Sequence, residues 1–334
     1  MNGLLTYTES GIYCPQGDFF IDPWRPVDRA IITHAHADHA RPGHKHYLTQ
    51  TLNREILKLR LGNDIRLQLL DHGASQTING VKLSFHPAGH IWGSCQVRLE
   101  YKGEVWVVSG DYKVESDGFS GEFEPVRCHT FITETTFGLP VFKWRPQEEV
   151  INQINDWWRR NATAGKTSIL CAYALGKAQR ILYNIDHHIG KVFVQGAVAN
   201  VNEALERDGA QLPAYAYACP DIDKREYPGS LIITPSSSVG TSWMRKFQPY
   251  EVATVSGWMQ IRGIKRRRNS GHGFVMSDHA DWDGLNWAVA QTGAEKVYVT
   301  HGYTDVFKKW LEQQGLEAGI VETKFDGEVL ENQQ

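Results

Sequence analysis

The sequence contains no stretch of about 20 apolar residues, the length that a membrane helix needs. Its first residues, MNGLLTYTESGIY, show neither a basic start nor an apolar run of signal-peptide length. The five cysteines are an odd number, lie far apart and form no C-x-x-C pair, which argues against a disulfide framework and a cysteine zinc site. We therefore expect a cytoplasmic protein without a membrane segment, whose cysteines act as small buried hydrophobic residues.

Neither positive nor negative residues greatly outnumber the other. With 35 Lys and Arg against 38 Asp and Glu, the formal net charge is −3, so global charge does not favour nonspecific nucleic-acid binding. Bound metal ions would add positive charge locally. The length of 334 residues is typical of one large or two medium domains, and 41% hydrophobic residues are ordinary for a globular protein.

Short apolar runs bounded by Gly, Pro or Asp dominate the first part of the chain and predict strands. One helix is expected over 53–61, ending at Gly62. Consecutive strands with few helices favour sheets packed on each other rather than a doubly wound sheet. The expected strands are 17–22, 29–34, 81–86, 95–101, 104–110 and 128–134.

From Pro146 onward, predicted strands and helices alternate, which is typical of βα units and a parallel sheet. Two last strands, near 273–277 and 296–301, each lead to a histidine. We therefore expect three segments: a first part of the main domain, an inserted α/β domain, and a return to the main domain. Their bounds are 1–145, 146–256 and 257–334.

Four residues of metal-ligand type follow the strand at 29–34, in the run H-A-H-A-D-H (34–39). Alternate residues on an extended backbone point the same way, so His34 and His36 can bind one ion together. Asp38 and His39 can then face a second ion. Imidazoles and carboxylates suit zinc, manganese or iron, and three protein ligands leave a position for water. This run predicts the centre of a two-metal hydrolase.

Two further ligand candidates follow a loop and a strand. His90 in A-G-H could complete a three-histidine set, and Asp111 in S-G-D offers a carboxylate that could bridge both ions. The glycine before each allows the backbone to approach the cluster closely.

Three more polar residues end strands in the second half: Glu134 in I-T-E-T-T-F-G, His279 in S-D-H-A-D and His301 in T-H-G. A purely structural interpretation would make Glu134 a surface acid and the two histidines caps at strand ends. Beside a dinuclear cluster, the functional interpretation is favoured.

The motifs H-A-H-A-D-H, A-G-H and S-G-D, in this order, resemble the successive ligand motifs of the metallo-β-lactamase superfamily. This resemblance implies an αββα sandwich and an α/β fold class. It implies that His34, His36 and His90 hold one ion, while Asp38 and His39 hold the other and Asp111 bridges them. Asp22, in F-I-D-P, matches a buried acid that supports the ligands; a turn-forming Asp before Pro23 is the alternative.

The three later motifs resemble those of the β-CASP branch of that superfamily, whose members cut nucleic acids. The resemblance implies that Glu134 orients His279, which protonates the leaving oxygen as a general acid, and that His301 completes the second metal site. Segment 146–256, with ALGKAQRIL (174–182), resembles the inserted β-CASP domain. His at the third motif is typical of RNA-processing members, whereas the eukaryotic DNA-repair members typically have Val there.

Longer runs, among them GDFFIDPWRPVDRAIITHAHADHARPG, EFEPVRCHTFITETTFGLP and SDHADWDGL, resemble the bacterial DNA ligase-associated exonuclease family over nearly the whole chain. This implies a DNA exonuclease in end processing or repair, acting beside an ATP-dependent ligase and a helicase. Two divalent ions, zinc first and manganese as the alternative, would activate a hydroxide that Asp38 or Asp111 orients. A ribonuclease acting on RNA is the alternative function.

Candidate phosphate contacts are less specific. Ser236, Ser237 and Ser238 could bind phosphate with the N-terminus of a following helix, or could simply cap it. Arg266 and Arg267, in a basic run, could contact the nucleic-acid backbone or lie in a solvated loop. Four aromatic residues are further candidates for stacking on bases, with burial in the core as the alternative: Trp24, Phe137, Trp258 and Trp282.

Two other classes of function fit less well. A lactam or thioester hydrolase leaves the inserted segment and the Glu134–His279 pair without a role. A non-catalytic scaffold would not need the full set of candidate ligands.

Overall fold

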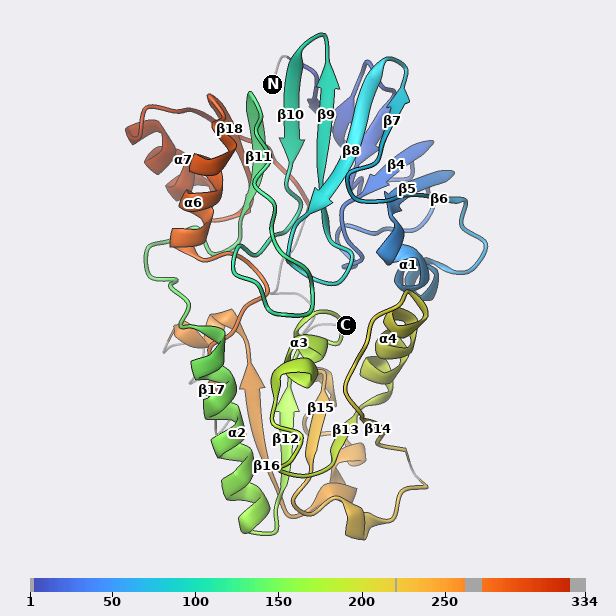
Figure 1. Ribbon diagram of the computed structural model, residues 1–334, viewed down its shortest axis with the longest axis vertical. Coiled ribbons are helices and arrows are strands. Elements are labelled where there is room, and N and C mark those ends of the chain that lie inside the picture. Colours follow the sequence, from blue (N-terminus) through green and yellow to red (C-terminus); the bar gives the residue numbers. More distant parts are fainter. Residues whose placement is uncertain (1–2, 220, 262–271, 325–334) are drawn as a thin grey trace. The chain divides into compact units, whose positions relative to one another are not determined.

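A computed structural model describes residues 3–219, 221–261 and 272–324 (Figure 1). Within these ranges the chain divides into two compact units. The first combines the chain up to Lys143 with the chain from His279 onward, and the second spans Trp144–Asp278. The first unit is therefore discontinuous in sequence.

The predicted return to the main domain at residue 257 comes too early. Strand β17 (His272–Phe274) pairs in parallel with β16 (Tyr250–Val255), with Ala253 opposite His272. These backbone hydrogen bonds keep the chain in the second unit as far as Asp278. The sequence did not reveal this because the segment before β17 carries a basic run rather than an apolar strand pattern.

The first unit contains two sheets. In the six-stranded sheet, β1, β2 and β3 are antiparallel neighbours, whereas β3 to β6 run parallel. The strands follow the order of the chain: β1 (Thr6–Thr8), β2 (Gly11–Cys14), β3 (Phe19–Ile21), β4 (Arg29–Ile32), β5 (His46–Gln50) and β6 (Leu67–Leu70).

The seven-stranded sheet is mixed. Strands β10, β11, β18 and β19 run parallel to one another, and β8 has the same direction because β9 is antiparallel to both β8 and β10. The carboxyl ends of four strands that carry site residues therefore lie at the same edge. The order is β19 (Glu317–Ile320), β18 (Lys296–Gly302), β11 (Thr130–Thr135), β10 (Glu104–Val108), β9 (Cys95–Tyr101), β8 (Val81–Pro87) and β7 (Ser75–Ile78).

The two sheets pack face to face through an apolar core. Ile31 and Leu48 from one sheet meet Phe85, Val97 and other side chains from the other. The outer face of the seven-stranded sheet is covered by α6 (Trp282–Thr292) and α7 (Thr304–Gln313), whose Leu285 and Phe307 join Phe131 in a second core. The remaining helical segment is η1 (Thr51–Asn53) with α1 (Arg54–Leu61). Packed sheets, predicted from the strand pattern, are confirmed.

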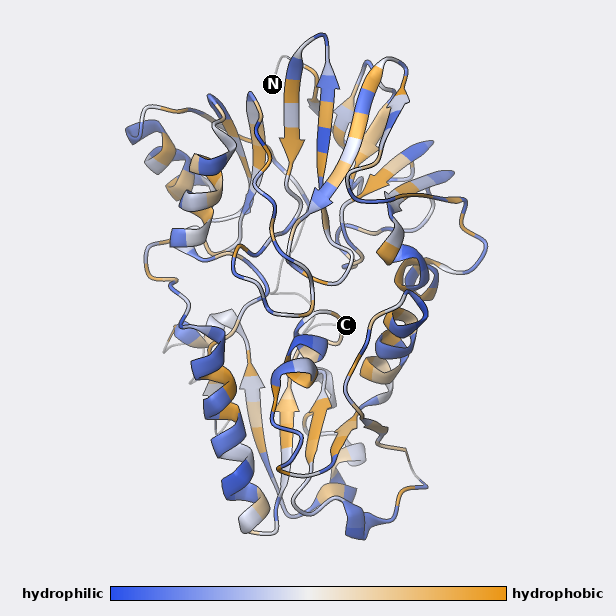
Figure 2. Cartoon of the chain, viewed as in Figure 1, coloured by the Kyte–Doolittle hydropathy of each residue, from blue (hydrophilic) through white to orange (hydrophobic). Residues whose placement is uncertain are grey.

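The second unit is a six-stranded sheet in which every pairing is parallel. Its central strands are apolar along their length, as Figure 2 shows, because helices pack on one face and 3₁₀ segments on the other. The strand order is β14 (Ala216–Tyr217), β13 (Val192–Val194), β15 (Leu231–Thr234), β12 (Thr167–Cys171), β16 and β17. The helices are α2 (Gln147–Thr163), α3 (Lys177–Asn184), α4 (Gly196–Arg207), η2 (Lys224–Glu226), η3 (Ser236–Ser238), η4 (Ser242–Phe247) and η5 (Gly257–Gln260).

This parallel sheet confirms the βα units predicted from the alternating pattern, and the chain as a whole is a mixed α/β protein with several sheets. Among the described residues, no helix is both long enough and apolar enough to cross a membrane.

Candidate metal centre

Five strands of the first unit deliver the predicted ligands to one place. The run 34–39 follows β4, His90 follows β8, and Asp111 follows β10. Glu134 lies near the end of β11 and His301 near the end of β18, where a register shift after Glu134 interrupts their pairing. Parallel strand ends thus gather residues that are up to 267 positions apart in the sequence (His301 minus His34).

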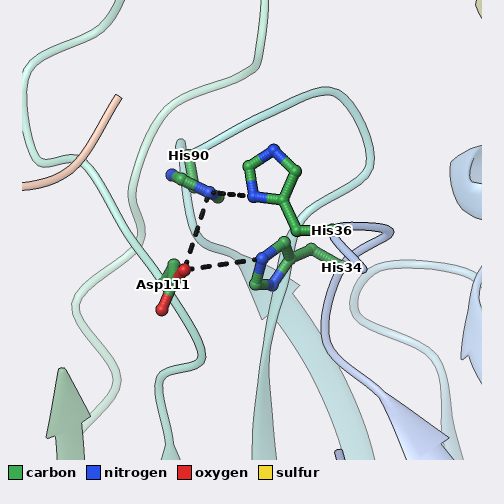
Figure 3. A group of neighbouring side chains, drawn as sticks. All are labelled: His34, His36, His90 and Asp111. Carbon is green, nitrogen blue, oxygen red and sulfur yellow. Dashed lines mark hydrogen bonds and ion pairs between the residues drawn. The ribbon is translucent and has the colours of Figure 1, made fainter. Parts of the chain in front are cut away.

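His34, His36, His90 and Asp111 form a compact cluster, with one ligand atom from each within 4.8 Å of all the others (Figure 3). His36 Nδ1 lies 3.1 Å from His90 Nε2, and His34 Nε2 lies 3.5 Å from Asp111 Oδ2. Two ligands in tetrahedral contact with one zinc ion would lie about 3.4 Å apart. The separations therefore match those of ligands around a shared ion.

The protonation state of His34 follows from a chain of hydrogen bonds. Thr33 Oγ1 donates its only proton to Asp22 Oδ2 at 2.6 Å, so at 3.0 Å it can only accept from His34 Nδ1. The Nε2 atom of His34 then carries the lone pair. This Nε2 is buried and has no hydrogen-bond partner among the described residues. A buried imidazole nitrogen with a free lone pair is well suited to hold a metal ion.

Asp22 also orients a second histidine. Its Oδ2 accepts a hydrogen bond from His39 Nδ1 at 2.8 Å, and its Oδ1 accepts from the Thr33 backbone N–H at 2.8 Å. Its φ of 43° is unusual for a residue other than glycine. The backbone strain is offset by three hydrogen bonds, which is typical of a carboxylate that fixes ligand orientation.

His39 also contacts Asp111, and Asp38 lies beside His39. His39 Nε2 lies 3.5 Å from Asp111 Oδ2 and 3.8 Å from Asp38 Oδ2. Asp111 Oδ2 is thus 3.5 Å from the Nε2 atoms of both His34 and His39. A carboxylate oxygen at equal distances from His34 and His39 has the geometry that a ligand bridging two ions requires.

His301 is held in the same manner as His34. Thr300 Oγ1 donates to the Thr133 carbonyl at 3.4 Å and therefore accepts from His301 Nδ1 at 2.9 Å. The Nε2 of His301 lies 3.1 Å from Asp111 Oδ1, the carboxylate oxygen opposite the other histidines. Asp111 thus contacts both halves of the cluster.

Charge within the cluster is strongly coupled. Burial, and after it the neighbouring His39, holds the pKa of His34 well below its usual value, so His34 is neutral. Burial alone would lower the pKa of His39, but the carboxylates of Asp111 and Asp38 outweigh it and raise that pKa well above its usual value. The site of His39 Nε2 is therefore one that attracts positive charge, from a proton or a metal ion.

Asp111 shows the opposite effect. Burial would raise the pKa of its carboxyl group, but the imidazoles around it, His39 and His301 first, hold the pKa well below its usual range. Asp111 is therefore ionised although it is buried. The donor set of imidazoles and ionised carboxylates fits a divalent transition metal.

Glu134 and His279 form a separate pair beside the cluster. Both carboxylate oxygens of Glu134 lie close to His279 Nδ1, at 2.8 and 3.0 Å, and Oε1 also accepts from the Tyr112 backbone N–H at 2.8 Å. Because a carboxylate can only accept, Nδ1 carries a proton and the other ring nitrogen faces elsewhere. Both side chains are buried. The two side chains are therefore in direct contact, and the role of Glu134 in orienting His279 stays a prediction.

Glycines next to two ligands have the expected steric role. At Gly110, φ is +58° and an added Cβ would lie 2.7 Å from the Thr33 side chain. At Gly89, φ is +70° and an added Cβ would lie 2.5 Å from the Lys113 carbonyl oxygen. Any other residue would push the Asp22–Thr33–His34 chain or the His90 loop out of place.

The hydroxyls of Thr33 and Thr300 were not anticipated from the sequence. Each precedes a candidate ligand, in the pairs Thr33-His34 and Thr300-His301, and each accepts from Nδ1 of the following imidazole. The repeated T-H dipeptide at strand ends was the available signal.

Replacing Thr33 by valine should weaken ion binding by about 10–100-fold, because His34 would lose the acceptor that fixes its ring. Competition with a chromophoric chelator would measure the affinity. Thr49→Val is the matched control: Thr49 is also buried, and its hydroxyl donates to the Ile32 carbonyl at 2.8 Å rather than supporting a ligand. Equal losses in the two variants would contradict the role of Thr33.

The serine segment does not form the expected helix N-terminus. Ser236–Ser238 is itself a single 3₁₀ turn, and η4, another 3₁₀ segment, follows it, so no α-helix dipole points at these hydroxyls. Ser238 is buried and Ser237 is exposed. Arg266 and Arg267 lie outside the described residues.

Three of the four aromatic candidates for base stacking are wrong. Phe137, Trp24 and Trp282 are buried, with exposed fractions of 0%, 8% and 9%, because they fill the core of the first unit. Trp258 is partly exposed and belongs to the second unit.

Two known proteins that are similar to this chain have names that refer to nucleic acids. A probable DNA ligase from Opitutus terrae is 27% identical over 93% of this chain, and endoribonuclease YSH1 from Saccharomyces cerevisiae is 27% identical over 37% of it. The chain spans only 30% of the first relative and 16% of the second. No protein-family model matches the chain.

A solved structure shows that the fold is shared. A protein of unknown function from Enterococcus faecalis V583 has a TM-score of 0.60 at 12% identity, covering 87% of this chain and 78% of that one. This likeness concerns the fold alone.

Proposed function

We propose that this protein is a metal-dependent nuclease of the metallo-β-lactamase fold with a β-CASP insert, and that it degrades DNA from an end. The proposal rests on two features that occur together. The carboxylate of Asp111 contacts His34, His39 and His301. Beside it, Glu134 holds Nδ1 of His279. Ion binding alone would not need the Glu134–His279 pair. Similarity to proteins named as a DNA ligase and an endoribonuclease supports a nucleic-acid substrate.

The proposed ligands fall into two sets that share Asp111. One set is His34, His36, His90 and Asp111; the other is Asp38, His39, His301 and Asp111. Two divalent ions, zinc first and manganese as the alternative, would supply an activated water and positive charge against the phosphate oxygens.

The chain's own residues provide the remaining chemistry. Asp38 is only half-buried, so its carboxylate can accept a hydrogen bond from the attacking water and orient it. With Nδ1 of His279 held by Glu134, its Nε2 is the nitrogen that would give a proton to the leaving oxygen. The Glu134 carboxylate favours the protonated imidazole before that transfer and keeps the ring in one orientation.

The ligase relative supports a proposal for the biological role. In the ligase relative, the matching region accounts for 30% of a longer chain, so a similar domain is joined to further sequence there. We propose that this protein trims DNA ends in repair, beside an ATP-dependent ligase and a helicase.

Ribonuclease activity is the second candidate, favoured by His301 at the third β-CASP motif and by the similarity to YSH1. End-labelled DNA and RNA of the same sequence, incubated with metal-loaded protein, distinguish the two. We expect progressive shortening of DNA and little change in RNA. The His34→Ala variant, purified in parallel, controls for contaminating nuclease. Degradation of RNA alone would replace the DNA proposal by the ribonuclease.

A further inference from the structure

Two basic side chains of α3 are buried in the second unit. Lys177 is 1% exposed and Arg180 is 3% exposed, and both face Asp278, which is 3% exposed. Lys177 Nζ lies 3.5 Å from Asp278 Oδ2, and Arg180 Nη1 lies 3.2 Å from Asp278 Oδ1. Burying three charges is costly, and a hydrophobic group of similar size would often serve stability as well. The arrangement therefore calls for a role beyond packing.

Arg180 makes the more directional contacts. Its Nη1 donates to the Ser277 carbonyl at 2.6 Å, and its Nε donates to Gln147 Oε1 at 2.5 Å, near the start of α2. The planar guanidinium thus binds the backbone of residue 277 and the side chain of residue 278 at once. These are the two residues directly before His279.

The residues after His279 are fixed as well. The Ala280 N–H donates to the Tyr112 carbonyl at 2.7 Å, and Asp281 caps α6 by accepting from the Gly284 N–H at 2.8 Å. Tyr112 is also the residue whose N–H holds Glu134. The residues after His279 are thus bound within the first unit, and the two residues before it are bound by Arg180 within the second unit.

We propose that Arg180 is a positioning residue that holds the backbone before His279, so that its ring meets Glu134 and the leaving oxygen at the correct angle. This inference rests on the proposed role of His279 as the proton donor. Arg180 does not need to touch substrate or metal. The physical reason is that a shift of about 1 Å in a catalytic group can cost about 100-fold in rate.

Arg180→Ala should lower kcat by about 10–100-fold with little change in KM, while the ion content stays that of the unmodified protein. Arg180→Lys should lower kcat too, because an ammonium cannot contact Gln147, Ser277 and Asp278 together. This variant keeps a buried positive charge and guards against a general folding defect. Arg159→Ala is the control, since Arg159 forms exposed ion pairs with Asp156 and Asp186 in the same unit. Unchanged kcat in both Arg180 variants would overturn the inference.

A double variant separates positioning from structural damage. If Arg180 acts through His279, adding Arg180→Ala to His279→Ala should cause no further loss of kcat, because the group that it positions is already gone. An additional 10-fold or larger loss in the double variant would show that Arg180 acts independently, and would overturn the inference. If His279→Ala alone leaves kcat unchanged, the proposed function itself fails, which is a different result.

Discussion

Replacing His279 by alanine is expected to lower turnover by about 10²–10⁴-fold, the range that a general acid contributes, while the bound ions are retained. His279 Nδ1 is engaged by both oxygens of Glu134, so the ring is held in one orientation. In the proposed mechanism the doubly protonated ring gives its second proton from Nε2. Loss of this proton donor forces the leaving oxygen to depart unprotonated, which raises the barrier for chemistry rather than for binding. The effect should therefore appear in kcat, with KM nearly unchanged.

Two measurements test this prediction together. Single-turnover rates on end-labelled DNA give the chemical step, and elemental analysis of the purified variant gives its metal content. His46→Ala is a matched control, since His46 is exposed and begins β5, at the strand end opposite the site. Glu134→Gln should produce a smaller loss of the same kind, because the neutral amide holds the ring less firmly.

One alternative role of His279, that of a metal ligand, can be tested separately. Asp111, Glu134 and His279 offer ligand atoms within 4.8 Å of one another, so His279 could itself hold an ion. In that case His279→Ala would release metal, and turnover would fall through loss of the ion. Metal loss in this variant would contradict the role as an acid.

Replacing Asp111 by asparagine is expected to weaken binding of both ions by at least about 100-fold, beyond the range typical of residues that only support ligands. The change keeps the shape of the side chain but removes the single carboxylate that faces His34, His39 and His301. It also removes the charge that attracts cations to this buried position, where the imidazoles hold the pKa of Asp111 well below its usual range.

Isothermal titration of the metal-free protein with zinc would show this loss as a change in both affinity and stoichiometry. Asp28→Asn serves as the control, because Asp28 is exposed and its carboxylate forms an ion pair with Lys45 at the protein surface. If the asparagine variant loses one ion and binds the other with unchanged affinity, Asp111 belongs to a single site and the bridging role is wrong.

Much of the site could be predicted because its residues carry local signals. The run 34–39 places four ligand-type residues after an apolar strand, and His90, Asp111 and His301 each follow or end another strand. Parallel strands deliver their carboxyl ends to one edge, so strand-end residues meet without further information. Helices α6 and α7 and the short strands β1, β2 and β5–β7 went unpredicted because their apolar pattern is short or interrupted.

Other features depend on partners distant in the sequence. Nothing in the local pattern distinguishes the buried Trp24 from the partly exposed Trp258, because burial is decided by which elements cover each side chain. The end of the second unit at Asp278 depends on the pairing of β17 with β16, and the short 3₁₀ turns around Ser238 depend on packing against that unit's sheet.

The sequence by itself determined which residue types are available for metal and proton chemistry, and that strand ends would present them. Only the tertiary structure decided which atoms act. The hydroxyl of Thr33 leaves Nε2 of His34 with its lone pair. Asp111 turns Oδ2 toward His34 and His39 and Oδ1 toward His301, and the Glu134 carboxylate contacts Nδ1 of His279. The contacts of Asp111 and Glu134 join residues far apart in the chain, which no local pattern encodes.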